Sequence, residues 1–232
     1  MESIQAGSRG PFVALLQSLL NRAGASPRLR VDSDWGPLTD QAFMTVLGAR
    51  SVIGLQTNPA IWRNLGLTVE IDHPVRRHAQ PTDMTCWSAS MTMLTGHVQS
   101  IGPDSAVLGP GNGLVGDDAN VELFARQHGK VIVSRHQSLP VAGLIGILRR
   151  GPALILGRGR DRRRPDGTLT NGWGHACVLS GIWSTGDADG LTTLFRVHDP
   201  WPKNRGRIWH EFYNGQPGRS MGYGRFGDTI IQ

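Results

Sequence analysis

Two apolar segments separated by a short polar turn constrain the fold of this chain more than any other feature. The segments read GHACVLSGIW (174–183) and LTTLFRVHDP (191–200), and the turn between them begins STGDADG. Apolar runs that flank a turn rich in glycine and aspartate are typical of a β-hairpin. We therefore expect two antiparallel strands here, and RIWHEFY (207–213) reads as a further strand.

Helical patterns dominate the region before this hairpin. TCWSASMTMLTG predicts a helix from about Cys86 to Gly96, DDANVELFARQHG predicts one with Asp117 or Asp118 as N-cap, and SLPVAGLIGILRRG predicts one capped by Ser138. VIVSRH and ALILG read as strands. Helices followed by an antiparallel sheet predict an α+β fold for this part of the chain.

The composition is that of an ordinary folded protein. Of the 232 residues, 39% are apolar and 18% are charged, and the net charge is +6. This charge favours anionic surroundings such as a cell envelope, an acidic protein or a nucleic acid. The arginine-rich stretch RGRDRRRP (158–165) reads as a solvated loop, and nucleic-acid binding is not expected because the stretch lacks interleaved aromatic residues.

A compact helical unit is expected at the N-terminus. Apolar residues recur at helical spacing from Phe12 to Leu20, directly behind Gly10 and Pro11. A second helix is expected from Pro37 or Leu38 to about Leu47, and the turn-rich SPRLRVDSDWGP separates the two.

This N-terminal unit resembles the small three-helix peptidoglycan-binding domain found on many bacterial and phage cell-wall enzymes. The resemblance is carried by GSRGPFVALLQSLLN and VDSDWGPLTDQAF, and Ser33 departs from it because the family usually has glycine there. Most matched positions are helix core and turn, so the match indicates the fold better than the ligand. A docking or export module is the alternative. The matched positions are Gly7, Gly10, Leu16, Gln17, Leu20, Asn21, Asp32, Trp35, Gly36 and Thr39.

Three parts are expected along the chain. Residues 1–50 form the peptidoglycan-binding-like domain, residues 51–72 form a connector and residues 73–232 form the larger α+β domain. The connector contains the apolar residues Ile61, Trp62 and Leu65, so we expect it to be packed rather than free.

Cys86, in QPTDMTCWSAS, is one of only two cysteines, and its role has to be read from its surroundings. Free cysteines are usually small buried core residues. A nucleophilic cysteine instead needs a helix N-terminus and a basic partner, because a thiol with a pKa near ~8.5 is mostly protonated at neutral pH. The predicted helix that starts at Cys86 supplies the first requirement.

His175 is the candidate for the basic partner, because it opens the first strand of the hairpin at the edge of the sheet. Asp199 ends the second strand. Antiparallel pairing places the start of one strand next to the end of the other, so these two side chains are expected to be neighbours. A carboxylate beside the imidazole would hold it in one tautomer and stabilise its charged form.

Gln80 completes the candidate set. Attack on an amide carbonyl generates an oxyanion, which needs hydrogen-bond donors that are fixed in advance. A glutamine six residues before the cysteine can offer its side-chain N–H beside the backbone N–H of Cys86.

With these residues identified, residues 73–213 resemble the papain-like cysteine peptidases, most closely the bacteriocin-processing branch. The shared motifs are Gln-x5-Cys-Trp, Gly-His-x-x-Val-Leu-x-Gly and Asp-Pro-Trp-Pro, in that order. The resemblance implies that Cys86 is the nucleophile, His175 the general base and then acid, Asp199 the orienting carboxylate and Gln80 an oxyanion donor. The domain is short for a papain, so the family's substrate subsites are not carried over.

Other chemistries receive less support from the sequence. The histidines and cysteines show no zinc-ligand spacing, so neither a metal nor a cofactor is expected. GNGLVG (111–116) spells a dinucleotide motif but follows no convincing strand. Cys177 is expected to be a packing residue on its strand, and its spacing neither shows nor excludes a disulfide with Cys86.

The expected function is that of a cysteine peptidase or amidase acting through an acyl-enzyme. We expect an exported antibacterial effector that cleaves a protein or peptidoglycan peptides, with a cognate immunity protein as partner. The alternatives are a phage-type cell-wall lysin and a non-catalytic peptidoglycan-binding adaptor.

The first residues, MESIQAGSRGPFVALLQSLL, lack the features of a signal peptide, and no apolar run reaches the ~20 residues that span a bilayer. We therefore expect synthesis in the cytoplasm without a signal peptide, and export by a specialised secretion system or release by lysis.

Overall fold

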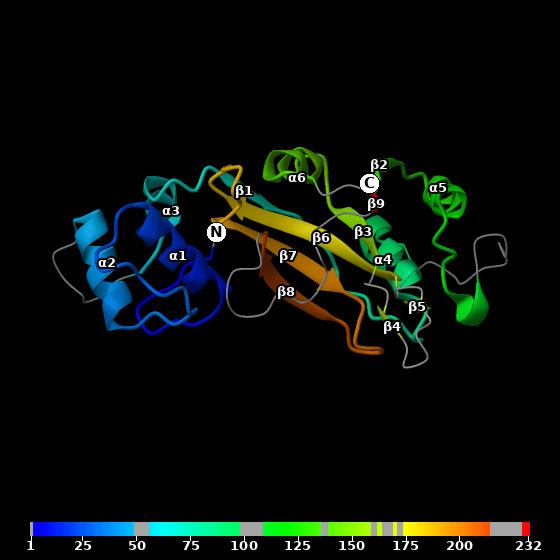
Figure 1. Cartoon of the computed structure of the whole chain (residues 1–232), viewed down its shortest axis with the longest axis horizontal. Helices are drawn as coiled ribbons and strands as arrows, with labels where there is room; N and C mark the ends of the chain where they lie inside the picture. The colour runs from blue at the N-terminus through cyan, green and yellow to red at the C-terminus, as the bar shows by residue number, and fades with distance from the viewer. Residues whose placement is uncertain are drawn as a thin grey trace. The chain divides into compact units, whose positions relative to one another are not determined.

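A computed structural model describes residues 2–48, 56–97, 109–135, 139–158, 162–163, 169–170, 174–213 and 229–232. Helices and a mainly antiparallel sheet are combined in it, which confirms the expected α+β class (Figure 1). The helices are α1 (Pro11–Arg22), α2 (Pro37–Leu47), α3 (Pro59–Asn64), α4 (Cys86–Thr95), α5 (Asp118–Gln127) and α6 (Val141–Leu148), with a short 3₁₀ helix at Pro110–Asn112.

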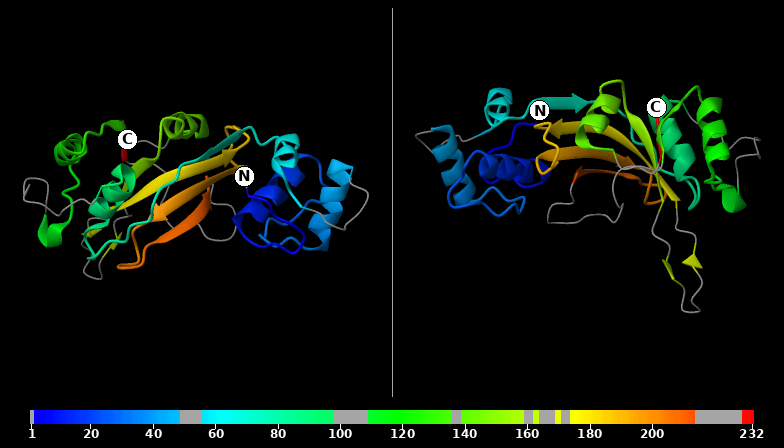
Figure 2. Two further views of the ribbon diagram at one scale, coloured as in Figure 1. Left: turned by 180° about the vertical axis from the view of Figure 1, so that it is seen from behind. Right: turned by 45° about the horizontal axis from the view of Figure 1, so that its top comes forward.

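The main sheet has the strand order β2-β9-β3-β6-β7-β8, and β1 pairs with β6 beside this path. Its strands are β1 (Val69–Asp72), β2 (Ile132–Arg135), β3 (Ala153–Arg158), β6 (Gly174–Ser184), β7 (Thr193–Asp199), β8 (Arg207–Phe212) and β9 (Thr229–Ile231). The expected hairpin is confirmed as β6 and β7, which lie side by side in both views of Figure 2. Strands β4 (Arg162–Arg163) and β5 (Leu169–Thr170) form a separate two-stranded sheet.

Contacts along the chain define two compact units. The first comprises the chain up to Glu70, Ile182–Phe195 and a segment that begins at His210, and the second comprises Ile71–Gly181, Arg196–Trp209 and the C-terminal strand. The boundaries at residues 50 and 72 stay a prediction. The tip of the hairpin belongs to the same unit as the N-terminal helices, which the sequence did not indicate.

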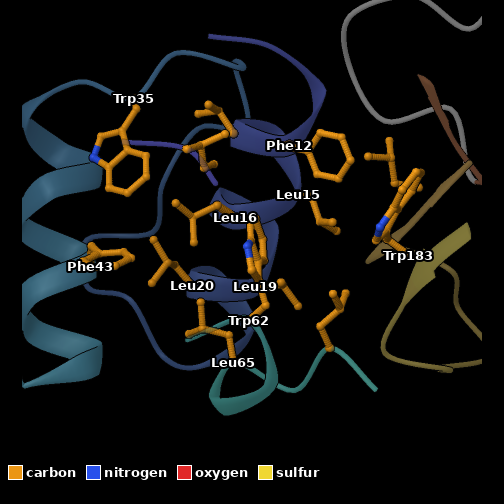
Figure 3. Packing of buried hydrophobic residues seen from close by; sticks show 14 of the residues in the cluster. Phe12, Leu15, Leu16, Leu19, Leu20, Trp35, Phe43, Trp62, Leu65 and Trp183 are labelled. Atoms are coloured by element: carbon orange, nitrogen blue, oxygen red, sulfur yellow. The ribbon is translucent and has the colours of Figure 1, made fainter. Parts of the chain in front are cut away.

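The core of the first unit is built around the apolar face of α1 (Figure 3). Pro11 occupies the first turn of α1, where its missing N–H costs nothing. The rings of Phe12 and Trp183 meet edge to face, with centroids 5.0 Å apart. Trp62 and Leu65 are also buried in this core, so α3 packs within the unit.

The buried amide of Gln17 joins α1 to the turn before α2. Its Nε2 lies 2.8 Å from Asp32 Oδ1 and 3.2 Å from Thr39 Oγ1, and its Oε1 accepts the N–H groups of Asp32 and Ser33 at 3.0 and 3.1 Å. Asn21 makes a reciprocal pair with the backbone of Leu29. Several positions that carry the resemblance to the peptidoglycan-binding domain are thus structural.

Ser33 is expected to destabilise this turn, because its φ of 66° lies in the left-handed region. That conformation costs a non-glycine residue about 1–2 kcal/mol, against about 0.5–1 kcal/mol for the extra flexibility of a glycine. We predict that Ser33→Gly raises the free energy of unfolding by about 0.5 kcal/mol. The free energy of unfolding, measured with a denaturant, should not increase for Ser33→Ala, because alanine keeps the strained conformation. An equal gain for both variants would contradict this explanation.

The second unit places α4 against the sheet. The Oγ of Ser90 in α4 donates to the carbonyl oxygen of Ala176 in β6 at 2.9 Å. Trp87 packs edge to face on Phe124 of α5. Packing of the almost fully buried α4 against β3, together with this hydrogen bond to β6, therefore fixes its first residue close to the start of β6.

Most helix ends agree with the sequence patterns. Gly48 and Gly96 end α2 and α4 in the left-handed conformation, and the Asp117 side chain accepts the N–H of Asn120 at the start of α5. The expected cap of α6 at Ser138 is wrong, because the helix begins at Val141 with Pro140 as its N-cap residue and without a side-chain cap. Most of the arginine-rich stretch lies outside the described residues. Within the described part of the chain, no helix has the length and apolar character required to cross a bilayer.

Candidate active site

Cys86 is the first residue of α4, as the sequence predicted. The residue before it, Thr85, makes no side-chain cap to the helix, and its hydroxyl is instead within hydrogen-bonding distance of the Thr82 backbone. The first N–H groups of α4 are therefore not occupied by a side-chain cap from Thr85. Cys86 has an exposed fraction of 9%, so a negative charge on its sulfur would feel the positive end of the helix dipole with little screening.

His175 and Asp199 form a hydrogen bond, with 2.6 Å between His175 Nε2 and Asp199 Oδ1. This confirms the expectation that the hairpin brings these residues together. Gly157 lies opposite His175 on β3 and has no side chain to cover the imidazole. The start of β6 therefore carries the imidazole, and the carboxylate at the end of β7 holds it.

The carboxylate of Asp199 is completely buried and has further partners. Its Oδ1 also accepts the backbone N–H of Trp201 at 2.8 Å, and its Oδ2 accepts Nε and Nη2 of Arg207 at 3.2 and 3.1 Å. These bonds fix the carboxylate and therefore the orientation of the imidazole. The sequence did not identify Arg207 as a partner, because no motif links it to Asp199.

The imidazole also interacts with both thiols of the chain. Burial by itself would lower the pKa of His175, but hydrogen bonds to Asp199, Cys177 and Cys86 outweigh burial and raise that pKa. Since Asp199 holds Nε2, proton exchange with a thiol falls to Nδ1. Both cysteines are free thiols.

Cys177 lies nearer to this group than the sequence analysis expected. Its sulfur, an imidazole nitrogen of His175 and a carboxylate oxygen of Asp199 all lie within 4.8 Å of one another. The signal was present in the sequence, because residues two apart on a strand share a face. Burial raises the pKa of Cys177 to about 11, so it is a neutral thiol at physiological pH and a poorer nucleophile candidate than Cys86.

Gln80 is buried on the segment that leads into α4. Its backbone N–H donates to Pro200 at 3.1 Å and its carbonyl accepts from Asn204 at 2.9 Å, which ties this segment to the residues that follow Asp199. Its side-chain Nε2 donates to the carbonyl of Thr82 at 2.6 Å, and its Oε1 has no hydrogen-bond partner among the described residues. One N–H of the side-chain amide thus donates to the Thr82 carbonyl. The second N–H is the one that would donate to an oxyanion.

The arrangement combines a thiol at a helix N-terminus, an imidazole and a carboxylate that orients the imidazole. This is the minimum set for nucleophilic catalysis by a cysteine. The same donors, with the second thiol, are also of the types that bind soft metal ions. No protein-family model matches the chain, and a search of curated proteins finds no significant relative.

Proposed function

We propose that this protein is a cysteine hydrolase that cleaves amide bonds through an acyl-enzyme. The observation that carries the proposal is the bond between His175 and Asp199, made where the start of β6 meets the end of β7 and where the imidazole also interacts with Cys86. In papain-like peptidases a helix carries the cysteine and a sheet carries the histidine and the third residue. The motifs of this chain and the helix-and-sheet division of its candidate residues support that fold.

The proposed reaction has two half-reactions. The Cys86 thiolate attacks the carbonyl carbon, and the tetrahedral intermediate collapses as His175 gives its proton to the leaving amine. Water then attacks the thioester while His175 takes its proton, which releases the carboxylic acid and regenerates the thiol. Asp199 stabilises the charged imidazole throughout.

The oxyanion of each intermediate would be held by two donors. The backbone N–H of Cys86 is at the start of α4, where the N–H groups have no hydrogen-bond acceptor within the helix. The second N–H of the Gln80 amide is the proposed partner, because its backbone is fixed between Pro200 and Asn204. Loss of one such donor typically costs about 3 kcal/mol of transition-state stabilisation.

For the substrate, we favour a protein or the peptides of bacterial peptidoglycan, and for the role an exported antibacterial effector with a cognate immunity protein. The first unit supports the wall connection through its resemblance to the peptidoglycan-binding domain. The motifs of the second unit support a protein substrate.

The proposal is tested by incubating the wild type and Cys86→Ala with purified peptidoglycan and, separately, with a bacterial lysate. Mass spectrometry should detect new fragments with the wild type and none with the variant. Muropeptide release identifies the wall as substrate, and discrete protein fragments identify a protease. Circular dichroism of both proteins checks that the substitution leaves the fold intact.

Two results together would refute the hydrolase. The first is the absence of Cys86-dependent fragments in both incubations, and the second is the absence of Cys86 labelling by iodoacetamide at a pH of ~6, where an isolated thiol is almost entirely protonated. A well-folded protein with both results would instead fit a non-catalytic adaptor.

A further inference from the structure

The second thiol beside His175 has no part in the proposed hydrolysis. Cys177 is two residues from His175 on β6, and its sulfur belongs to the same group of potential ligand atoms within 4.8 Å. The Cys86 sulfur approaches the same imidazole from the start of α4. One sulfur from α4 and one from β6 therefore lie around a single imidazole, and both cysteines are only 9% exposed.

The carboxylate of Asp199 is placed to orient His175 as a metal ligand, not to bind the metal itself. Its two oxygens already accept hydrogen bonds from His175, Trp201 and Arg207. In protein metal sites a ligating histidine almost always donates its other ring N–H to a carboxylate or carbonyl group. The bond from His175 Nε2 to Asp199 has this form, and it leaves Nδ1 as the ligand nitrogen.

We propose that Cys86, Cys177 and His175 bind one Zn²⁺ ion, with water as the fourth ligand and Asp199 orienting the imidazole. Two thiolates, one imidazole and a water form a known tetrahedral zinc set. Zn–S and Zn–N lengths of about 2.3 and 2.0 Å place neighbouring ligand atoms about 3.5 Å apart, so the separation of at most 4.8 Å between the His175 nitrogen and the Cys177 sulfur closes by small side-chain rotations. The Cys86 sulfur interacts with the same imidazole and would have to turn toward the ion from the start of α4. The sequence spacing did not show this set, because Cys86 and the His175–Cys177 pair are far apart in the chain.

Zinc binding and thiol hydrolysis exclude one another. A sulfur bound to the metal cannot attack a carbonyl, and a ring nitrogen bound to the metal cannot exchange a proton. Binding also displaces the thiol protons, since the thiolate is the metal ligand. The ion would therefore hold the enzyme inactive until a chelator or a zinc-poor environment removes it. This consequence rests on the proposed hydrolase, whereas the zinc site itself does not.

The test is a zinc titration of the full chain against a chromogenic chelator, with Co²⁺ as a spectroscopic substitute. The wild type should bind one Zn²⁺ per chain, and Co²⁺ should give a near-ultraviolet thiolate charge-transfer band. Cys177→Ser should weaken zinc binding by more than about 100-fold, because loss of even an outer-shell partner costs about 10- to 100-fold. His97→Gln, which removes an exposed imidazole beyond the end of α4, should bind as the wild type does.

A second measurement, alkylation of Cys86, tests whether this cysteine is a zinc ligand and also needs no substrate. Zn²⁺ should protect Cys86 from iodoacetamide in the wild type and in His97→Gln, and should fail to protect it in Cys177→Ser. Circular dichroism of Cys177→Ser before labelling confirms that it is folded. Equal zinc affinity of Cys177→Ser and the wild type, or a wild type without a thiolate charge-transfer band, would overturn the proposal. Zinc binding by a protein that shows no hydrolysis even after a chelator has removed the metal would refute only the proposed function.

Discussion

Replacing His175 with glutamine is expected to lower the rate of amide cleavage by roughly 10³- to 10⁴-fold, the upper part of the range for general acid–base catalysis. Glutamine can still donate a hydrogen bond toward Asp199 but cannot carry a proton between the thiol and the leaving amine. The imidazole is positioned for that transfer by its 2.6 Å bond to Asp199. The measurement is initial-rate kinetics on the fragment-yielding substrate.

The same variant gives a result that needs no substrate. Hydrogen bonds raise the pKa of His175, so the wild-type imidazole keeps its proton above its ordinary range. A positively charged imidazole beside a thiol favours the thiolate form. A cysteine without such a partner is about 1% thiolate at a pH of ~6.5. We therefore expect His175→Gln to slow alkylation of Cys86 at that pH, and the difference between the two alkylation rates should narrow as the pH approaches ~8.5.

His97→Gln is the matched control, because it makes the same chemical change at an exposed position beyond α4. It should retain both the cleavage rate and the alkylation rate of the wild type. If His175→Gln is alkylated as fast as the wild type at all pH values, His175 is not the basic partner of Cys86.

Local patterns predicted the parts of the site that depend on neighbouring residues. The hairpin could be predicted because its turn and its two apolar runs lie within one stretch, and antiparallel pairing then places His175 beside Asp199. The start of α4 at Cys86 could be predicted from the helix-sized run that ends at Gly96. Each of these inferences needed only short-range information.

What the sequence did not indicate depends on long-range packing. Strand β9 (Thr229–Ile231) has three residues, too few to show a period, yet it pairs with both β2 and β3. Trp183 lies on an apolar strand, and nothing local indicates that it packs against Phe12. The strand period already indicated that Cys177 shares a face with His175, whereas the approach of Cys86 to the same imidazole depends on how α4 packs.

The buried carboxylate of Asp199 supports the fold as well as the site. Its oxygens accept hydrogen bonds from the His175 imidazole, the Trp201 N–H and the Arg207 guanidinium, with nitrogen–oxygen distances of no more than 3.2 Å. Removing one partner of a buried ion pair typically costs about 3–5 kcal/mol, because the remaining groups lose their counter-charge in a poorly solvated location. Arg207 is 37% exposed and water can reach it, which favours the lower end of that range.

We therefore expect Asp199→Ala to lower the free energy of unfolding by about 3 kcal/mol, measured by urea unfolding with tryptophan fluorescence and circular dichroism. Asp72→Ala is the control in the same unit, since the Asp72 carboxylate is 46% exposed and its partner Arg196 keeps hydrogen bonds to Ser180 and to the His73 carbonyl. An exposed pair contributes about 1 kcal/mol or less, so this control should unfold at nearly the wild-type denaturant concentration. A loss of about 1 kcal/mol or less for Asp199→Ala as well would show that the bonds around Asp199 orient the imidazole without stabilising the unit.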